Sequence, residues 1–284
     1  MTDVQLLGAQ DIRRLATALD VAPTKKWGQN FVIDPNTVRR IVDQAHVDAS
    51  DVVVEIGPGL GSLTLALLDQ AKQVVAVEID PRLATQLPIT IQEFAPSRAS
   101  DVVVITQDAL TITELPVAPT KLVANLPYNV SVPVVLHMLE HFPSISEVLV
   151  MVQLEVADRL AAQPGSKIYG VPSVKASWYG QVTKAGAIGR NVFWPAPNVD
   201  SGLVRIVRRE TPGDDNLRQK MFAIVDSAFG QRRKTLRTAL GAALGAPNVV
   251  EEILRRAGID PSLRGEQISL EDFVAIARAT GEVQ

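Results

Sequence analysis

At residues 52–62 the chain reads Val52-Val53-Val54-Glu55-Ile56-Gly57-Pro58-Gly59-Leu60-Gly61-Ser62. The first five residues are mostly apolar and β-branched, which is typical of a short strand buried on both faces. A glycine-rich turn follows at once, and the apolar residues of 63–68 predict a helix directly after it. A strand, a glycine turn and a helix in this order bring a ligand close to backbone N–H groups at the start of the helix. The segment therefore predicts a ligand-binding α/β sheet.

The alternation of strands and helices continues beyond this segment. β-Branched runs predict strands, and helical spacing of apolar residues predicts helices, at residues 73–77, 81–94, 102–106, 121–124, 132–141 and 147–152. Repeated strand–helix units imply a parallel sheet with helices on both faces. The predicted fold class is therefore α/β with a Rossmann-like sheet.

The predicted strands end on glycine or polar residues. Gly57, Glu78, Asp108 and Asn125 each follow or close one of the strands. In an open α/β sheet the carboxyl ends of the strands form one crevice, and ligands bind there. Four such ends are far more specific than the glycine turn alone, so we expect these residues to line one ligand site.

The spacing of the glycines bears on the identity of the ligand. A dinucleotide-binding turn has the pattern G-x-G-x-x-G, whereas here Gly57 and Gly59 are followed by a glycine at the fifth position and Ser62 at the sixth. The turn alone suits nicotinamide or flavin enzymes nearly as well as methyl transfer. S-adenosylmethionine has no pyrophosphate; it needs a close backbone approach for its methionine part, an acid for its ribose and a polar contact for its adenine. Because the glycine turn, Glu78 and Asp108 would supply these contacts, we favour S-adenosylmethionine over NAD.

The strand at 121–124 ends in Asn125-Leu126-Pro127-Tyr128. An amide, a backbone carbonyl freed from strand pairing by the following proline, and an aromatic ring would suit a flat, hydrogen-bonding ligand such as a nucleobase. An isolated segment of this kind is more often a plain turn, because Asn and Pro are ordinary turn residues. The predicted cofactor site at the neighbouring strand ends favours base binding here.

Composition bears on where the protein acts. The 284 residues suffice for one full domain and a smaller one. Apolar residues make up 46% of the chain, but no apolar run reaches the roughly 18–20 residues that a membrane span needs. No secretory signal is visible, and the absence of cysteine excludes disulfides and thiolate metal sites. We therefore expect a cytoplasmic protein that does not enter a membrane.

The regular alternation of predicted strands and helices ends at about residue 153. Residues 164–172 predict a glycine-rich loop that lacks the Gly-Lys-Ser/Thr ending of a P-loop, and residues from about 214 onward predict helices. The predicted domains are residues 1–208, which contain the sheet, and residues 209–284, which form a smaller C-terminal α-helical domain.

The net charge of −3 argues against a nucleic-acid partner, but the distribution of charge argues for one. Cations crowd one part of the C-terminal third, at Arg205, Arg208, Arg209, Arg218, Lys220, Arg232, Arg233, Lys234 and Arg237. They predict a local basic face. The alternative is a set of solvated helix faces that bind nothing.

Eight short segments of the chain match one family of enzymes. They are residues 28–31, 55–61, 77–80, 107–110, 125–128, 169–174, 193–201 and 232–237. The pattern resembles the bacterial 16S ribosomal RNA adenine dimethyltransferases, a family with a class I S-adenosylmethionine-dependent methyltransferase fold that methylates two adjacent adenosines near the 3′ end of small-subunit RNA. The resemblance implies S-adenosylmethionine as cofactor, 16S rRNA in the immature 30S subunit as partner, and no metal.

The resemblance also implies roles for individual residues. Cofactor contacts would come from Asn30, Val32, Gly57, Gly59, Glu78, Asp108 and Asn125. Contacts to the target base would come from Asn125, Leu126, Tyr128 and Phe193, and Trp194 beside Phe193 leaves open which ring stacks on the base. RNA contacts would come from Lys25, Lys26, Arg232, Arg233, Lys234 and Arg237.

Methyl transfer to adenine requires little acid–base chemistry from the protein. The exocyclic N6 is a poor nucleophile because its lone pair is delocalised into the ring. Hydrogen bonds from N6 to the Asn125 side-chain oxygen and the Leu126 carbonyl would aim that lone pair at the methyl group. Tyr128 and Phe193 would hold the base between them.

Two alternatives remain open. A 23S rRNA adenine methyltransferase of the antibiotic-resistance type would share the crevice and the Asn-x-Pro-Tyr tip, and only the motifs at 169–174 and 193–201 favour the small-subunit enzyme. An assembly factor that binds the immature small subunit through its cations is the second alternative, and the two roles are compatible. In either case we expect a monomer.

Overall fold

A computed structural model describes residues 3–20, 30–127 and 130–282 of the chain. The chain divides into two compact units. Unit 1 contains Met1–Ala157 and Thr183–Arg208, and unit 2 contains Asp158–Val182 and Arg209–Gln284. One division between the units follows Arg208, and the predicted domains 1–208 and 209–284 stay a prediction. The sequence placed the segment 158–182 in the first domain. Its contacts in the structure make it part of unit 2.

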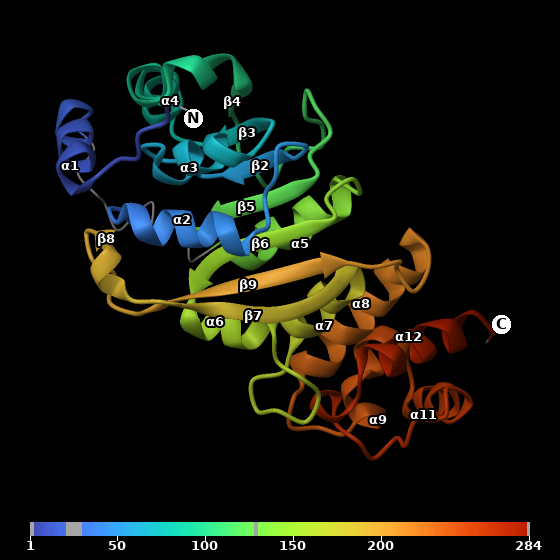
Figure 1. The fold of residues 1–284 in the computed structure, drawn as a ribbon. Helices are drawn as coiled ribbons and strands as arrows, with labels where there is room; N and C mark the ends of the chain where they lie inside the picture. The colour runs from blue at the N-terminus through green and yellow to red at the C-terminus, as the bar shows by residue number, and fades with distance from the viewer. Residues whose placement is uncertain (1–2, 21–29, 128–129, 283–284) are drawn as a thin grey trace. The chain divides into compact units, whose positions relative to one another are not determined.

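Seven strands of the described ranges form one sheet in the order β4-β3-β2-β5-β6-β9-β7 (Figure 1). Their bounds are β2 (Val52–Ile56), β3 (Gln73–Glu78), β4 (Val102–Thr106), β5 (Lys121–Asn125), β6 (Glu147–Gln153), β7 (Gly180–Ile188) and β9 (Ser201–Arg208). The pairs from β4 to β6 are parallel, and β9 runs antiparallel to β6. Two short strands, β1 (Phe31–Val32) and β8 (Phe193–Trp194), pair separately. The expected α/β sheet is confirmed.

The order of the strands locates the ligand crevice. From β2 the chain adds β3 and then β4 on one side, and it later adds β5 and then β6 on the other. The order of the strands therefore reverses between β2 and β5. In open α/β sheets ligands bind at such a reversal, outside the carboxyl ends of the strands.

Helices occupy most of the segments between the strands. In unit 1 they are α1 (Ala9–Ala18), α2 (Pro35–Gln44), α3 (Ser62–Gln70), α4 (Pro81–Phe94), η1 (Pro96–Asp101), α5 (Ser131–His141) and η2 (Arg190–Val192). The helix α6 (Leu154–Leu160) spans the boundary at residue 157. In unit 2 they are α7 (Val171–Tyr179), α8 (Asp215–Gly230), α9 (Leu236–Ala239), α10 (Gly241–Leu244), α11 (Pro247–Arg256), η3 (Gly265–Gln267), α12 (Leu270–Ala279) and η4 (Thr280–Glu282).

The glycine-rich loop predicted at 164–172 is shorter than expected. Helix α7 already begins at Val171, with Pro172 in its first turn. Proline is compatible with that position because the first N–H groups of a helix have no partner within the helix. The loop therefore ends at Gly170.

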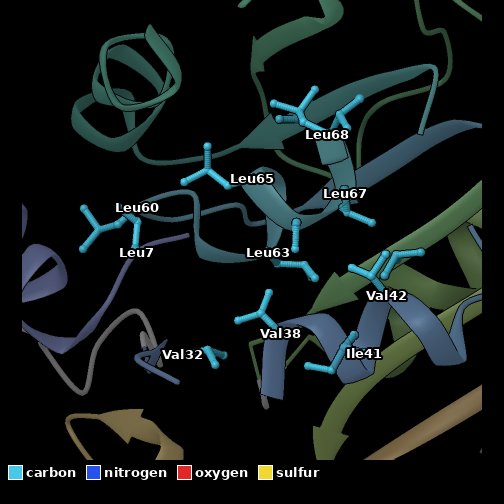
Figure 2. Close-up of a cluster of buried hydrophobic side chains, with 14 of the residues drawn as sticks. Leu7, Val32, Val38, Ile41, Val42, Leu60, Leu63, Leu65, Leu67 and Leu68 are labelled. Carbon is cyan, nitrogen blue, oxygen red and sulfur yellow. The ribbon is translucent and has the colours of Figure 1, made fainter. Parts of the chain in front are cut away.

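A hydrophobic cluster holds the glycine turn in place. Figure 2 shows Val38 and Val42 of α2 on the side of the helix that faces Leu63 and Leu67 of α3. All four side chains are at most 5% exposed. Burying each one contributes roughly 1.5–3 kcal/mol to the free energy of unfolding. Because α3 begins directly after the glycine turn, this packing fixes the turn at the end of β2.

Gly202 in β9 tests how tightly this unit is packed. A Cβ at residue 202 would lie 2.5 Å from the Cβ of Ala157 in α6. We expect Gly202→Ala to lower the free energy of unfolding by about 1–3 kcal/mol, because backbone must move to admit the methyl group. The control is Gly189→Ala, where no described atom outside the neighbouring residues lies within 4 Å and φ is −68°. Urea unfolding of both variants checks this, and equal midpoints would contradict it.

Candidate active site

The carboxyl ends of the strands open onto a cavity of about 280 Å³ within unit 1. Its lining includes every residue predicted to contact the cofactor, Asn30, Val32, Gly57, Gly59, Glu78, Asp108 and Asn125, and also Leu126. These residues come from β1, from the turn after β2, from the end of β3, from the segment after β4 and from the end of β5. The structure therefore brings together residues that the sequence spreads over almost 100 positions.

The turn after β2 has a backbone that only glycine adopts readily. The φ angles of Gly57, Gly59 and Gly61 are 69°, 60° and 98°. A Cβ on Gly61 would also lie 2.9 Å from the Cδ1 of Leu87, whereas a Cβ on Gly57 would have no described atom within 4 Å. The open space beside Gly57 is part of the cavity, so a ligand can approach the backbone closely there.

Glu78 is a buried acid at the end of β3. Its Oε2 accepts a hydrogen bond from the N–H of Gly59 at 3.1 Å, and its Oε1 accepts one from the N–H of Asp80 at 3.0 Å. The side chain is 4% exposed, and this burial raises the pKa of Glu78 above its ordinary value. Two backbone donors thus fix the orientation of the carboxyl group, and each oxygen keeps a second lone pair for a hydroxyl of a ligand.

Asn125 closes β5 with its amide held in one orientation. The side-chain Nδ2 donates a hydrogen bond to the backbone carbonyl of Asn30 at 3.1 Å. Because the N–H₂ side of the amide faces Asn30, the Oδ1 side is directed elsewhere and is the group suited to accept a hydrogen bond from a ligand. Leu126 follows, and its N–H donates to the carbonyl of Met151 at 3.0 Å.

Phe193, which is predicted to stack on the base, is covered by neighbouring side chains in this structure. It belongs to β8, pairs with Val32 of β1 and is 3% exposed within the hydrophobic cluster. Among the described residues that line the cavity, neither Phe193 nor Trp194 occurs. Trp194 is half-buried and packs against the same cluster. Stacking by either ring stays a prediction and requires that ring to be uncovered.

Three predicted site residues lie outside the described residues. These are Tyr128, Lys25 and Lys26. Their predicted contacts with the base and with RNA therefore stay predictions.

The predicted RNA-binding cations of unit 2 differ in their exposure and in their partners. Arg233 and Lys234 are exposed, and neither forms an ion pair with an acid of the described ranges. Arg237 is exposed as well but pairs with Glu251 at 3.1 Å. Arg232 is half-buried and donates hydrogen bonds within its own unit.

The basic cluster of the sequence is divided between the two units. Arg205 and Arg208 lie in β9 of unit 1, whereas the other seven cations belong to unit 2. Arg205 pairs with Glu147 at 2.5 Å. Arg208 donates to the carbonyls of Ile145 and Leu139 at 2.5 and 2.7 Å. These two side chains therefore fasten β9 to its surroundings within unit 1, and the basic face stays a prediction.

The described residues contain no group of three or more His, Cys, Asp or Glu side chains arranged to hold a metal ion. His137 and His141 stack with their ring centroids 4.1 Å apart, and His137 Nε2 lies 2.7 Å from the carbonyl of Ile112. No helix in the ranges that the structure describes is long and apolar enough to cross a membrane.

Glu55 is a residue of the cavity wall to which the sequence assigned no role. It lies in β2, is 1% exposed and accepts a hydrogen bond from the Oγ1 of Thr64 at 2.6 Å. Burial, with a smaller contribution from the charge of Glu78, raises the pKa of Glu55 to about 8. The carboxyl group is therefore mostly protonated at pH 7. An acid in the middle of an otherwise apolar strand was the signal in the sequence.

The proton on Glu55 predicts a pH dependence of stability. The unfolded chain releases this proton near the ordinary pKa of 4.5, whereas the native state keeps it up to about pH 8. The free energy of unfolding therefore falls as pH rises from about 4.5 to 8 and is constant above that window. Glu55→Gln removes this dependence, so its free energy of unfolding relative to that of the natural protein should rise across the window, by on the order of 5 kcal/mol.

Thermal unfolding from pH 5 to pH 8.5 without cofactor measures this difference. Glu114→Gln is the matched control, because Glu114 is exposed and lies outside the cavity wall. We expect that control to follow the natural protein. Parallel pH profiles for Glu55→Gln and the natural protein would show that Glu55 is ionised in the native state.

Comparison with known proteins adds to this geometry. A family model described as "Ribosomal RNA adenine dimethylase" matches residues 22–280. The chain is 63% identical over 277 residues to "Ribosomal RNA small subunit methyltransferase A" of Corynebacterium glutamicum (strain R), with 96% of this chain and 94% of the relative covered. It is 62% identical over 280 residues to the protein of the same name from Streptomyces griseus, with 98% and 96% covered.

Two solved structures have a similar fold. The chain matches the 23S rRNA methyltransferase ErmE with a TM-score of 0.67 and 27% identity, covering 89% of this chain and 100% of that one. It matches a dimethyladenosine transferase from Plasmodium falciparum with a TM-score of 0.72 and 24% identity, covering 86% and 94%. The second likeness shows the fold alone.

Proposed function

The chain belongs to the ribosomal RNA adenine dimethylase family, and from this premise we propose that it dimethylates the N6 of two adjacent adenosines near the 3′ end of 16S rRNA. It is an S-adenosylmethionine-dependent methyltransferase of small-subunit ribosomal RNA. One observation supports the proposed location of the active site. Asn125 and Leu126, whose oxygens can accept hydrogen bonds from the edge of an adenine, line the same cavity as the glycine turn and Glu78.

The residues of the cavity fit S-adenosylmethionine. The space beside Gly57 admits a ligand close to the backbone, and the carboxyl group of Glu78 presents two oriented oxygens that suit ribose hydroxyls. Asp108 accepts a hydrogen bond from the N–H of Leu110 at 2.9 Å and offers its second oxygen to an adenine amino group. When bound, S-adenosylmethionine supplies a methyl group on a positively charged sulfonium.

The protein's own residues mainly activate the nucleophile, the N6 of adenine. The Asn125 Oδ1 and the Leu126 carbonyl accept hydrogen bonds from the two N6–H groups of the adenine and favour a pyramidal nitrogen whose lone pair faces the methyl group. These acceptors are most valuable when N6 becomes positively charged in the transition state. The hydrogen bond from Asn125 to Asn30 supports this role, because it holds the amide oxygen in place before the base arrives.

The proposal includes where the protein acts, its oligomeric state and the form of its substrate. We infer that the protein acts in the cytoplasm, as a monomer, on the immature 30S subunit. The relatives named as small-subunit methyltransferases support the choice of subunit. An additional role in subunit assembly is compatible with the exposed cations Arg233 and Lys234.

Incubation with radiolabelled cofactor and separately purified, undermethylated small and large subunits tests the proposal. We expect label in small-subunit RNA alone, and nuclease digestion should recover it as N6,N6-dimethyladenosine from the 3′ region. Label in large-subunit RNA alone would instead identify a 23S-type enzyme. Tight binding of small subunits without any label would favour an assembly factor.

A further inference from the structure

The loop of residues 163–170 in unit 2 has no part in the chemistry described above. It connects α6 to α7, and within it the N–H groups of Ile168 and Tyr169 donate to the side chain and carbonyl of Ser166 at 3.2 Å each. At its tip Lys167 is exposed, and Ile168, although apolar, is 47% exposed. The loop therefore presents a cation and an aliphatic side chain to solvent.

Arg232 fastens this loop. Its Nη2 donates to the carbonyl of Lys167 at 2.7 Å, and its Nη1 donates to the carbonyl of Tyr169 at 2.9 Å. Its Nε donates to the Oε2 of Glu266 at 2.8 Å. Every nitrogen of the guanidinium group thus donates to another part of unit 2, and its charge is matched by a carboxylate.

Glu266 contributes a second attachment. Its backbone carbonyl accepts a hydrogen bond from the N–H of Gly165 at 2.7 Å. The φ angle of Gly165 is 85°, which favours glycine at this bend of the loop. Residue 266 therefore holds the start of the loop through its backbone and the end of the loop through Arg232.

The neighbours of Arg232 complete a cationic surface. Arg233 and Lys234 follow it directly, are exposed, and are unpaired with any acid of the described ranges. The hydrogen bond from Arg232 to the carbonyl of Lys167 brings Lys167 next to this segment. Two cations that form no ion pair with a described acid therefore directly follow the residue that fastens the loop, and a third, Lys167, lies on the loop beside the exposed Ile168. Lysine and arginine bind phosphates, and the exposed Ile168 beside Lys167 offers apolar contact area to an unstacked base.

We propose that Arg232 and Glu266 form a clamp that positions the loop 163–170 for RNA binding, and that Lys167 and Ile168, rather than Arg232, contact the rRNA. This inference rests on the proposed function, because it assigns a surface to the same rRNA substrate. It changes the role of Arg232 from an RNA contact to a positioning residue.

The two roles of Arg232 predict opposite effects of one substitution. If Arg232 contacts phosphate, Glu266→Gln removes a competing negative charge, and RNA affinity stays the same or rises. If Arg232 clamps the loop, the same substitution weakens the clamp and affinity falls. Salt dependence separates the roles further, because each phosphate contact contributes about 0.7–0.9 to the slope of log K against log salt concentration.

Binding of the full-length protein to undermethylated small subunits, measured over a series of KCl concentrations, tests the clamp. We expect Glu266→Gln to weaken binding by about tenfold with an unchanged salt slope. Lys167→Ala should weaken binding and reduce the slope by about one phosphate contact, and Ile168→Ala should weaken binding at an unchanged slope. The exchange Arg232→Glu with Glu266→Arg should recover part of the affinity lost in either single variant.

Glu252→Gln is the matched control. Glu252 pairs with Arg256 on α11 at 2.9 Å, so this variant removes an acid from an Arg–Glu pair that does not touch the loop. We expect its affinity to equal that of the natural protein. Thermal unfolding shows whether each variant is folded, and Lys167→Ala and Ile168→Ala change only exposed side chains.

The outcomes separate this inference from the proposed function. If the natural protein neither binds nor methylates small subunits, the proposed function is wrong. If the natural protein does both while Glu266→Gln binds at least as tightly, or while Lys167→Ala and Ile168→Ala bind normally, the clamp is wrong and the function stands.

Discussion

Asn125→Ala lowers the rate of methyl transfer by about 100- to 1,000-fold, the range observed when one preorganised hydrogen-bonding group is removed from an active site. The physical reason is that N6 of adenine loses the acceptor that orients its lone pair. The Asn125 side chain also donates to the carbonyl of Asn30, so the variant removes one contact of the residue before β1. Binding of the small subunit should be largely unchanged, because the cations of unit 2 are untouched.

Single-turnover rates at saturating cofactor and saturating small subunits measure this effect apart from binding. Asn125→Asp is the informative companion variant, because it keeps the acceptor and the size of the side chain but has no N–H to donate to Asn30. We expect it to lose activity as well, since an unpaired buried charge costs more than an unpaired amide. A rate within threefold of the natural protein in Asn125→Ala would refute the proposed activation of N6.

Glu78→Ala weakens binding of S-adenosylmethionine by about 2–4 kcal/mol, which is roughly 30- to 1,000-fold in Kd. The variant removes the two oriented oxygens that suit the ribose hydroxyls. It also leaves the N–H groups of Gly59 and Asp80 without their acceptors, so the glycine turn loses part of its support. Isothermal titration with the cofactor measures the loss directly.

Asp80→Ala is the matched control for Glu78→Ala. Asp80 lies two residues further on, caps α4 through a hydrogen bond from the N–H of Arg82 at 2.9 Å, and is absent from the described part of the cavity wall. We expect this variant to lose about 1 kcal/mol of unfolding free energy, as is usual for a lost helix cap, but to keep its cofactor affinity. Equal losses of affinity in both variants would mean that the acids act through folding rather than through contact.

Most of the sheet and the cavity could be predicted from the sequence. The strands β2, β3 and β5 were found because β-branched runs buried on both faces have a local signature. The residues at their carboxyl ends could be grouped because parallel strands bring those ends to one edge. In contrast, β7 was missed, since Gly180–Ile188 has no regular alternation of buried and exposed positions and contains two glycines and two alanines.

The cations and the aromatic residues were predicted less well. A sequence cannot distinguish a guanidinium group that faces RNA from one that donates to carbonyls of its own unit, because the partners of Arg232 lie 34 to 65 residues away. Phe193, expected beside the base, packs in the hydrophobic cluster of this structure, so its contact with the base stays a prediction. The reason is the same in both cases. An aromatic side chain can pack in the protein core, and a cationic side chain can donate to a loop, as readily as either can bind a ligand.

The sequence by itself determined the α/β sheet, the glycine turn and the strand-end residues that line part of the cavity. These follow from local signals, namely the period of the apolar residues, glycines at positive φ and the polar ends of parallel strands. Only the tertiary structure decided that Glu55 carries a proton near pH 7, that the Asn125 amide is turned by Asn30, and that Arg232 fastens a loop. Each of these depends on groups far apart in the chain that meet only on folding. Burial removes the water that would otherwise solvate them, and the partners that replace this water set their charge and orientation.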